Sequence, residues 1–103
     1  MERTNFHRLN IFYFVAKQRS FSKAAQALSL SQPAVSIQVR ELEKSFGTPL
    51  LHRTGRGPVL TDTGRIAFDY AQRIFALADE MQAAVRDQQG LKGGRLTIGS
   101  SKR

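Results

Sequence analysis

The sequence of 103 residues contains no cysteine, which excludes a disulfide framework and a thiolate metal site. It has no apolar run approaching the roughly 20 residues that a membrane-spanning helix requires. The first four residues, Met-Glu-Arg-Thr, lack the apolar segment of a secretory signal peptide. We therefore expect a cytoplasmic protein with no metal site and no membrane partner.

Residues typical of catalytic sites are also scarce. The chain has two histidines, His7 and His52. The carboxylate nearest to His7 in sequence is that of Glu2, and His52 lies in a predicted strand. The sequence has no nucleophile elbow, no HExxH metalloprotease motif and no Walker-type phosphate loop. These absences disfavour a small hydrolytic enzyme. We therefore predict no catalytic residue and no cofactor.

Acidic residues are half as numerous as basic ones, eight Asp and Glu against sixteen Lys and Arg, which gives a net charge of +8. Residues 1–66 carry ten positive and four negative charges, residues 67–89 carry a net −2, and the last 14 residues a net +4. A small domain with such an excess favours a polyanionic partner, and the excess lies in the first 66 residues. A merely basic, solvated surface is the alternative.

Apolar spacing predicts three short helices in the first half of the chain. Over residues 6–18, Leu9, Phe12 and Val15 share one helical face, and Thr4 or Asn5 can cap the helix. The following residues 19–21 interrupt this pattern.

The second and third helices are marked by their ends. Ser22 is the expected N-cap of a helix that reaches Leu28, and Ser31 caps the next. Pro33 is tolerated in the first turn of that helix, and Gly47 is a fitting end. Two helices joined by a turn of three or four residues match the helix-turn-helix, although many small bundles contain such a pair.

The outer face of the third helix differs from an ordinary solvated face, where Lys and Glu are common. It presents short hydrogen-bonding groups of the kind that read base edges in DNA. These residues are Gln32, Pro33, Ser36 and Gln38, with Arg40 further along. The composition of this face favours DNA over a face that only meets water.

Residues 49–61 are typical of a short hairpin, with strand-like segments at 50–53 and 59–61 around a turn at 54–58. A basic hairpin tip beside a helix-turn-helix indicates a wing. Arg56, between two glycines, could enter the minor groove, and Arg53 could contact a phosphate. A plain flexible loop with two solvated arginines is the alternative.

A long helix is predicted next, from a cap at Thr61 or Asp62 to about Gln89, or roughly 40 Å. One apolar face carries a predicted dimerisation stripe: Ile66, Tyr70, Ile74, Leu77, Met81 and Ala84. A second apolar face contains Phe68, Ala71, Phe75, Ala78 and Val85. Because three short helices cannot cover both faces, we expect one to pack on the parent domain and one on a partner chain.

Residues 90–94 are predicted to form a hinge, and residues 95–101 alternate like a single strand. A domain rarely ends on a lone strand. We therefore interpret it as the first strand of a further, missing domain.

In this order and spacing, the segments over residues 6–101 resemble the LysR-type transcriptional regulators. The segments are Phe-Val-Ala at 14–16, Ser-Phe-Ser-Lys-Ala-Ala at 20–25, Leu-Ser-Gln-Pro-Ala-Val-Ser at 30–36, Leu-Glu at 42–43, Phe-Gly at 46–47, Pro-Leu-Leu at 49–51, Leu-Thr at 60–61 and Gly-Arg-Leu-Thr-Ile-Gly at 94–99, with Leu28, Arg53 and Gly64. Each piece is weak alone, but the whole is specific. The winged-helix domain of a molybdate-type regulator is a related alternative, disfavoured by the long helix and the run at 94–99.

The resemblance implies a bacterial or plastid regulator about three times this length, with an α/β effector domain that binds a small co-inducer. It also implies dimers joined through the long helix, paired into tetramers. Gln32, Pro33 and Ser36 match family positions that contact bases or nearby backbone. Arg56 matches the wing position in the minor groove, and Ser22 a position that touches phosphate at a helix start.

Ile37 departs from many family members, which carry a polar or basic residue there. It could pack on a thymine methyl group. If it instead turned into the core, the assignment of the outer face would be wrong by one position.

The expected fold is therefore mainly α. A winged helix-turn-helix of three helices and a two-stranded wing spans 1–61, a long linker and dimerisation helix spans 62–89, and the hinge and first strand of a truncated effector-binding domain span 90–103. A dimer is expected to read a pseudo-palindromic promoter site in double-stranded DNA. The predicted base contacts are Gln32, Pro33, Ser36, Ile37 and Arg56, and the predicted backbone contacts are Ser22, Lys23, Ser31, Gln38, Arg40 and Arg53. A dimerisation or adaptor module with incidental charge is the competing function.

Overall fold

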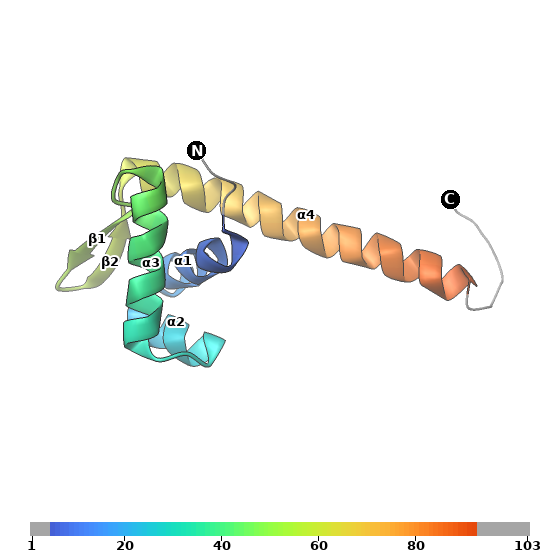
Figure 1. Ribbon diagram of the computed structural model, residues 1–103, viewed down its shortest axis with the longest axis horizontal. Coiled ribbons are helices and arrows are strands. Elements are labelled where there is room, and N and C mark those ends of the chain that lie inside the picture. The colour runs from blue at the N-terminus through green and yellow to red at the C-terminus, as the bar shows by residue number, and fades with distance from the viewer. Residues whose placement is uncertain (1–4, 93–103) are drawn as a thin grey trace. The chain divides into compact units, whose positions relative to one another are not determined.

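The structure, a computed structural model, describes residues 5–92. These form α1 (Phe6–Gln18), α2 (Phe21–Leu28), α3 (Gln32–Phe46), β1 (Leu51–Thr54), β2 (Gly57–Leu60) and α4 (Asp62–Lys92), with the two strands paired antiparallel (Figure 1). The predicted mainly α, winged helix-turn-helix fold with a long last helix is confirmed. The strand predicted at 95–101 lies outside the described residues.

The chain divides into two compact units, with the boundary between Gln72 and Arg73. The first unit contains α1 to β2 and the beginning of α4. The second contains the rest of α4. The division falls inside the long helix, after its eleventh residue, and the predicted domain boundary at residue 61 stays a prediction.

Helix ends follow the predicted capping chemistry with one exception. The side chain of Asn5 accepts a hydrogen bond from the backbone N–H of Arg8, and Gly47 ends α3 in the left-handed conformation. The N-cap of α2 is Ser20 rather than Ser22, because Ser20 has extended backbone angles and accepts from the N–H of Lys23. The prediction of Ser22 as the cap was wrong by two residues, and Phe21 begins the helix.

The core of the first unit lies where α1, α2 and α3 meet. It is entirely apolar among the described residues, and α3 joins α2 through the three residues 29–31. The inward faces of α1 and α3 bury Leu9, Phe12, Val15, Val35, Val39 and Leu42, whereas Ala16 and Phe46, which continue the same spacing, are half-buried. The small side chains of Ala24 and Ala25 are buried on α2 and let that helix approach its neighbours closely.

The wing is a regular two-stranded ribbon, in which β1 lies one residue later than predicted and β2 begins two residues earlier. Arg53 pairs with Pro58 and Thr54 with Gly57, so the turn is reduced to residues 55–56. Pro58 is buried in β2, although the sequence pattern placed it in the turn. Gly57 has a φ of 103°, and a β-carbon there would lie 2.7 Å from the carbonyl oxygen of Arg19. This close approach to the turn after α1 requires glycine.

The start of α4 is fastened to the loop before the wing. The hydroxyl of Thr61 accepts from the N–H of Gly64 at 2.8 Å and donates to the carbonyl of Pro49 at 2.9 Å. Gly64 is buried, and a β-carbon on it would overlap the carbonyl oxygen of Leu50. The sequence therefore fixes how α4 leaves the domain through a cap residue and an obligatory glycine.

One face of the first part of α4 packs on the parent domain, as predicted. Ala71 is buried, and the ring of Phe68 stacks on Tyr13 of α1 with centroids 5.1 Å apart. At its other end the helix continues through Gly90 to Lys92, three residues beyond the predicted end. The predicted hinge was thus wrong at residues 90–92, and the rest of it lies outside the described residues.

Candidate nucleic-acid interface

The exposed face of α3 carries most of the residues predicted to read bases. Gln32, Pro33 and Arg40 are exposed, and Ile37 is 58% exposed. Ile37 therefore does not turn into the core, whereas Ser36 and Gln38 of the predicted outer face are half-buried. Three consecutive core contacts, Val35, Val39 and Leu42, fix the rotation of the helix, so this face cannot turn inward without exposing them.

The wing supplies an arginine to the flank of this face. Arg53 on β1 donates from Nη1 to the hydroxyl of Ser36 on α3 at 3.2 Å. Its guanidinium also lies 4.4 Å from the centroid of the Phe21 ring, at the start of α2. Because arginine can only donate, Ser36 accepts here and its hydroxyl hydrogen is available for an acceptor outside the protein. The structure thus brings together two predicted DNA contacts that the sequence treated separately.

Gln38 occupies the opposite flank of the face and is half-buried. Its side-chain oxygen accepts from Nε of Arg8 on α1 at 2.9 Å. The amide oxygen is therefore turned toward α1, which leaves the NH₂ group as the part able to meet a phosphate. Sequence reasoning missed Arg8, since a contact across 30 residues of chain leaves no local pattern.

The serines and the lysine at the helix starts lie on the surface. Ser31 is exposed and caps α3 by accepting from the N–H of Ala34. Ser22 and Lys23 are exposed in the first turn of α2, and the Ser22 hydroxyl lies 3.1 Å from that of Ser20. Ser20 is a polar group at this helix start that the prediction did not include.

Arg56 stands exposed at the tip of the wing, in the two-residue turn. The hydroxyl of Thr54 accepts from the N–H of Arg56 at 3.1 Å and donates to the carbonyl of Gly57 at 2.7 Å. These bonds shape the tip that carries the Arg56 side chain. The wing is an ordered hairpin rather than a plain flexible loop.

The carboxylate of Glu43 connects the wing to α3. Glu43 accepts from the backbone N–H groups of Leu50 and Leu51, at 2.7 and 3.1 Å, through a single oxygen. The first residue of β1 is thereby anchored to the same helix that presents the exposed face. In the sequence Glu43 stands out only as part of the family pattern, and no spacing indicates its positioning role.

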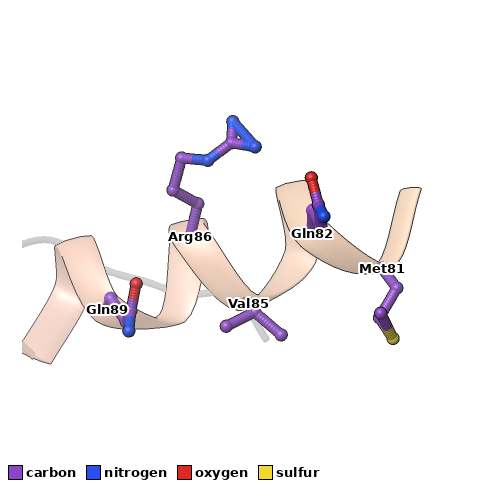
Figure 2. A pocket seen from close by; sticks show the side chains of 5 residues that line it. All are labelled: Met81, Gln82, Val85, Arg86 and Gln89. Atoms are coloured by element: carbon purple, nitrogen blue, oxygen red, sulfur yellow. The ribbon is translucent and has the colours of Figure 1, made fainter. Parts of the chain in front are cut away.

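Much of the predicted dimerisation stripe on α4 is exposed. In the first unit, Ile66 is 60% and Tyr70 54% exposed. In the second unit, Leu77 is 65% and Met81 60% exposed, Ala84 is exposed and Ile74 half-buried. Met81 and Val85 point to one side of the helix, whereas Gln82, Arg86 and Gln89 point to the other, and the five border an open depression (Figure 2).

Within residues 5–92, no group of three or more His, Asp or Glu side chains is placed to hold a metal ion. No helix there is long and apolar enough to cross a membrane.

Residues 6–65 match the family described as "Bacterial regulatory helix-turn-helix protein, lysR family". The chain belongs to the LysR family. The matched range ends one residue after Gly64, so it contains α1 to α3, the wing and the glycine that fixes the start of α4. Relatives of this LysR-family chain are regulators of transcription. One is a probable RuBisCO transcriptional regulator from Cyanidioschyzon merolae, 44% identical over 95 residues, which are 92% of this chain and 31% of that protein.

Solved structures with this fold include DNA complexes of two LysR regulators. The DNA-binding domain of CbnR bound to DNA aligns with a TM-score of 0.75 and 34% identity, covering 82% of this chain and 98% of that one. The BenM domain bound to its benA site 1 DNA aligns with a TM-score of 0.76 and 31% identity, covering 81% and 96%. The LysR-family chain therefore has the extent and fold of domains that were crystallised on DNA.

Proposed function

We propose that this chain binds double-stranded DNA sequence-specifically, as the DNA-binding part of a regulator of transcription rather than an enzyme. The observation that carries the proposal is the Arg53–Ser36 hydrogen bond, since it joins the basic wing to the exposed face of α3 in one surface. The net charge of +8 and the DNA complexes of CbnR and BenM support the same partner.

In this proposal α3 enters the major groove and the wing follows the adjacent minor groove. Gln32 and Ser36 hydrogen-bond base edges, and Ile37, which cannot, packs on a thymine methyl group. Pro33 lies against the same bases, and Arg56 enters the minor groove, where negative potential is concentrated. The remaining contacts are to the sugar-phosphate backbone: Ser22, Lys23, Ser31, Gln38, Arg40 and Arg53.

The exposed stripe on α4 is the proposed dimer contact. Its members are Ile66, Tyr70, Ile74, Leu77, Met81 and Ala84, and several expose more than half of a large apolar side chain. Pairing two chains with two-fold symmetry sets two copies of α3 on an inverted-repeat promoter site. From the family resemblance we further propose that the whole protein forms tetramers, binds a small co-inducer through a further domain and acts in the cytoplasm. This chain spans 31% of the length of its relative.

The test is a selection of binders from a randomised duplex pool at about 0.15 M salt, followed by sequencing. We expect an enriched inverted repeat, whose half-site spacing near one helical turn of about 10 base pairs reports the dimer. A variant with Arg53→Ala and Arg56→Ala is the control for the surface, and we expect it to dimerise and to enrich no motif. Retention of DNA without any enriched motif would mean charge-driven binding alone and would contradict the proposal.

A further inference from the structure

Phe21 has no assigned role in DNA recognition, yet it lies in direct contact with a residue proposed to have one. Its ring is half-buried at the first position of α2. The Arg53 guanidinium lies 4.4 Å from the ring centroid, within the distance at which a cation is attracted to an aromatic face. An apolar side chain that only filled the core would not need an arginine over its face.

The same guanidinium is held from a second direction. Nη1 of Arg53 donates to Ser36 at 3.2 Å, so the planar group is fixed both by the ring of α2 and by the hydroxyl of α3. Arginine has five N–H donors, and a single one is used in this bond. The others can meet a phosphate in an orientation that the protein has already set.

Arg53 is an exposed side chain, and a long exposed side chain normally loses rotamer freedom when it binds a partner. Holding Arg53 in one orientation before binding lowers the conformational entropy that it loses on binding. It also makes Ser36 an acceptor toward the protein, which leaves its hydroxyl hydrogen available for an acceptor on DNA.

We propose that Phe21 is a positioning residue for DNA recognition, which holds Arg53 and, through it, Ser36 in the orientation that binds DNA. This inference rests on the proposed function, because it assigns a mechanism to the same surface. It makes the α2 start, the wing and α3 one recognition unit.

The inference is tested with a double-mutant cycle on the duplex enriched from the random pool. Phe21→Leu keeps an apolar side chain but removes the aromatic face, and we expect it to weaken binding about threefold to tenfold. Phe21→Tyr keeps the face and should bind within about twofold of the parent protein. In an Arg53→Ala background, Phe21→Leu should change the affinity less than about twofold, because the group that the ring positions is absent.

The control is Phe14→Leu, an equivalent loss of a half-buried ring away from Arg53, which should leave DNA affinity unchanged. The thermal midpoint of every variant is measured in parallel, and affinities are compared well below it. If Phe21→Leu weakens binding equally with and without Arg53, Phe21 acts through the fold alone and the inference is wrong. If the parent protein enriches no motif, the proposed function itself fails, and the two failures are therefore distinguishable.

Discussion

The two units of the chain use their apolar residues in opposite ways. Between residues 5 and 72, apolar side chains from three helices and the wing are buried against one another. Between residues 73 and 90, no side chain is buried, although Leu77, Met81 and Val85 are each more than half exposed. The same helical periodicity thus completes a core in one unit and remains on the surface in the other. Periodicity shows that a face packs, but it does not show whether the partner is within the chain.

The polar side chains of the first unit have a structural role of their own. In the first unit, polar side chains connect elements: Glu43 holds the wing to α3, Thr61 holds α4 to the preceding loop, and Arg8 holds α1 to Gln38. These bonds position an exposed recognition surface without any buried charge among the described residues. The surface is therefore built by the fold, whereas its duplication in the proposed dimer would depend on the exposed stripe of α4.

We expect the largest effect from placing aspartates in the exposed stripe of the second unit, where the apolar side chains have no partner within the chain. Leu77→Asp combined with Met81→Asp should weaken dimerisation at least about a hundredfold, because two carboxylates would be buried without partners. Sedimentation should show monomers whose thermal midpoint is unchanged. The matched control is Gln82→Asp with Gln89→Asp, which adds the same charge at positions outside the stripe whose side chains point away from Met81 in Figure 2, and it should weaken dimerisation much less. Equal dissociation in both would indicate general repulsion rather than a specific face.

The next largest effect is a difference in stability between alanine substitutions at two glycines of α4. Gly64→Ala should destabilise the first unit by about 1–3 kcal/mol, since the β-carbon would overlap backbone that cannot easily yield. Gly90→Ala meets nothing within 4 Å and should leave the thermal midpoint unchanged or raise it slightly. Thermal unfolding of both variants provides the measurement. A Gly64→Ala protein as stable as the parent would show that the start of α4 is not fixed at Leu50.

Gln32→Ala sharpens the distinction between the recognition surface and general charge. It should cost about 1–3 kcal/mol on the enriched duplex and little on random duplexes, because it removes a base contact and no charge. Fluorescence anisotropy titrations on both duplexes measure the difference. A similar loss on both would remove Gln32 from the base-reading set.

The smallest effect concerns the contact between α1 and the first part of α4. Phe68→Leu should destabilise the unit by about 0.5–1.5 kcal/mol, because the stacked pair with Tyr13 is lost. Phe6→Leu changes a ring that is 53% exposed and should have almost no effect. Chemical denaturation of both variants is the measurement. An equal effect of the two changes would mean that the stack adds nothing to ordinary burial.

Most of the fold could be predicted from local patterns. Ser31 and Gly47 are predicted correctly because capping depends on residues three or four apart, and the structure selects Asn5 from the two caps, Thr4 and Asn5, that the sequence offers. The errors arise where neighbours offer equivalent chemistry. Ser20 and Ser22 flank Phe21, and either hydroxyl could cap; the backbone conformation decides for Ser20. At the other end of the chain, Gly90 continues the helix although glycine commonly ends one.

The candidate site could be predicted only in part. Which residues of α3 face outward follows from the apolar stripe, and the structure places Gln32, Pro33 and Ile37 on the exposed face. The bonds from Arg53 to Ser36 and from Arg8 to Gln38 join residues 17 and 30 positions apart. Such contacts depend on how the elements pack, and no spacing in the sequence indicates them. The contacts with DNA themselves stay predictions.

The central claim is that one recognition surface per chain is duplicated by pairing through α4. The most direct test is the mass of the complex formed on the enriched duplex, measured by native mass spectrometry or by sedimentation equilibrium. The account predicts two chains per duplex on the full enriched site, and also two chains, bound more weakly, on a duplex carrying a single half-site, because the dimer forms through α4 and not on the DNA. One chain bound to the full enriched site at saturation would contradict it.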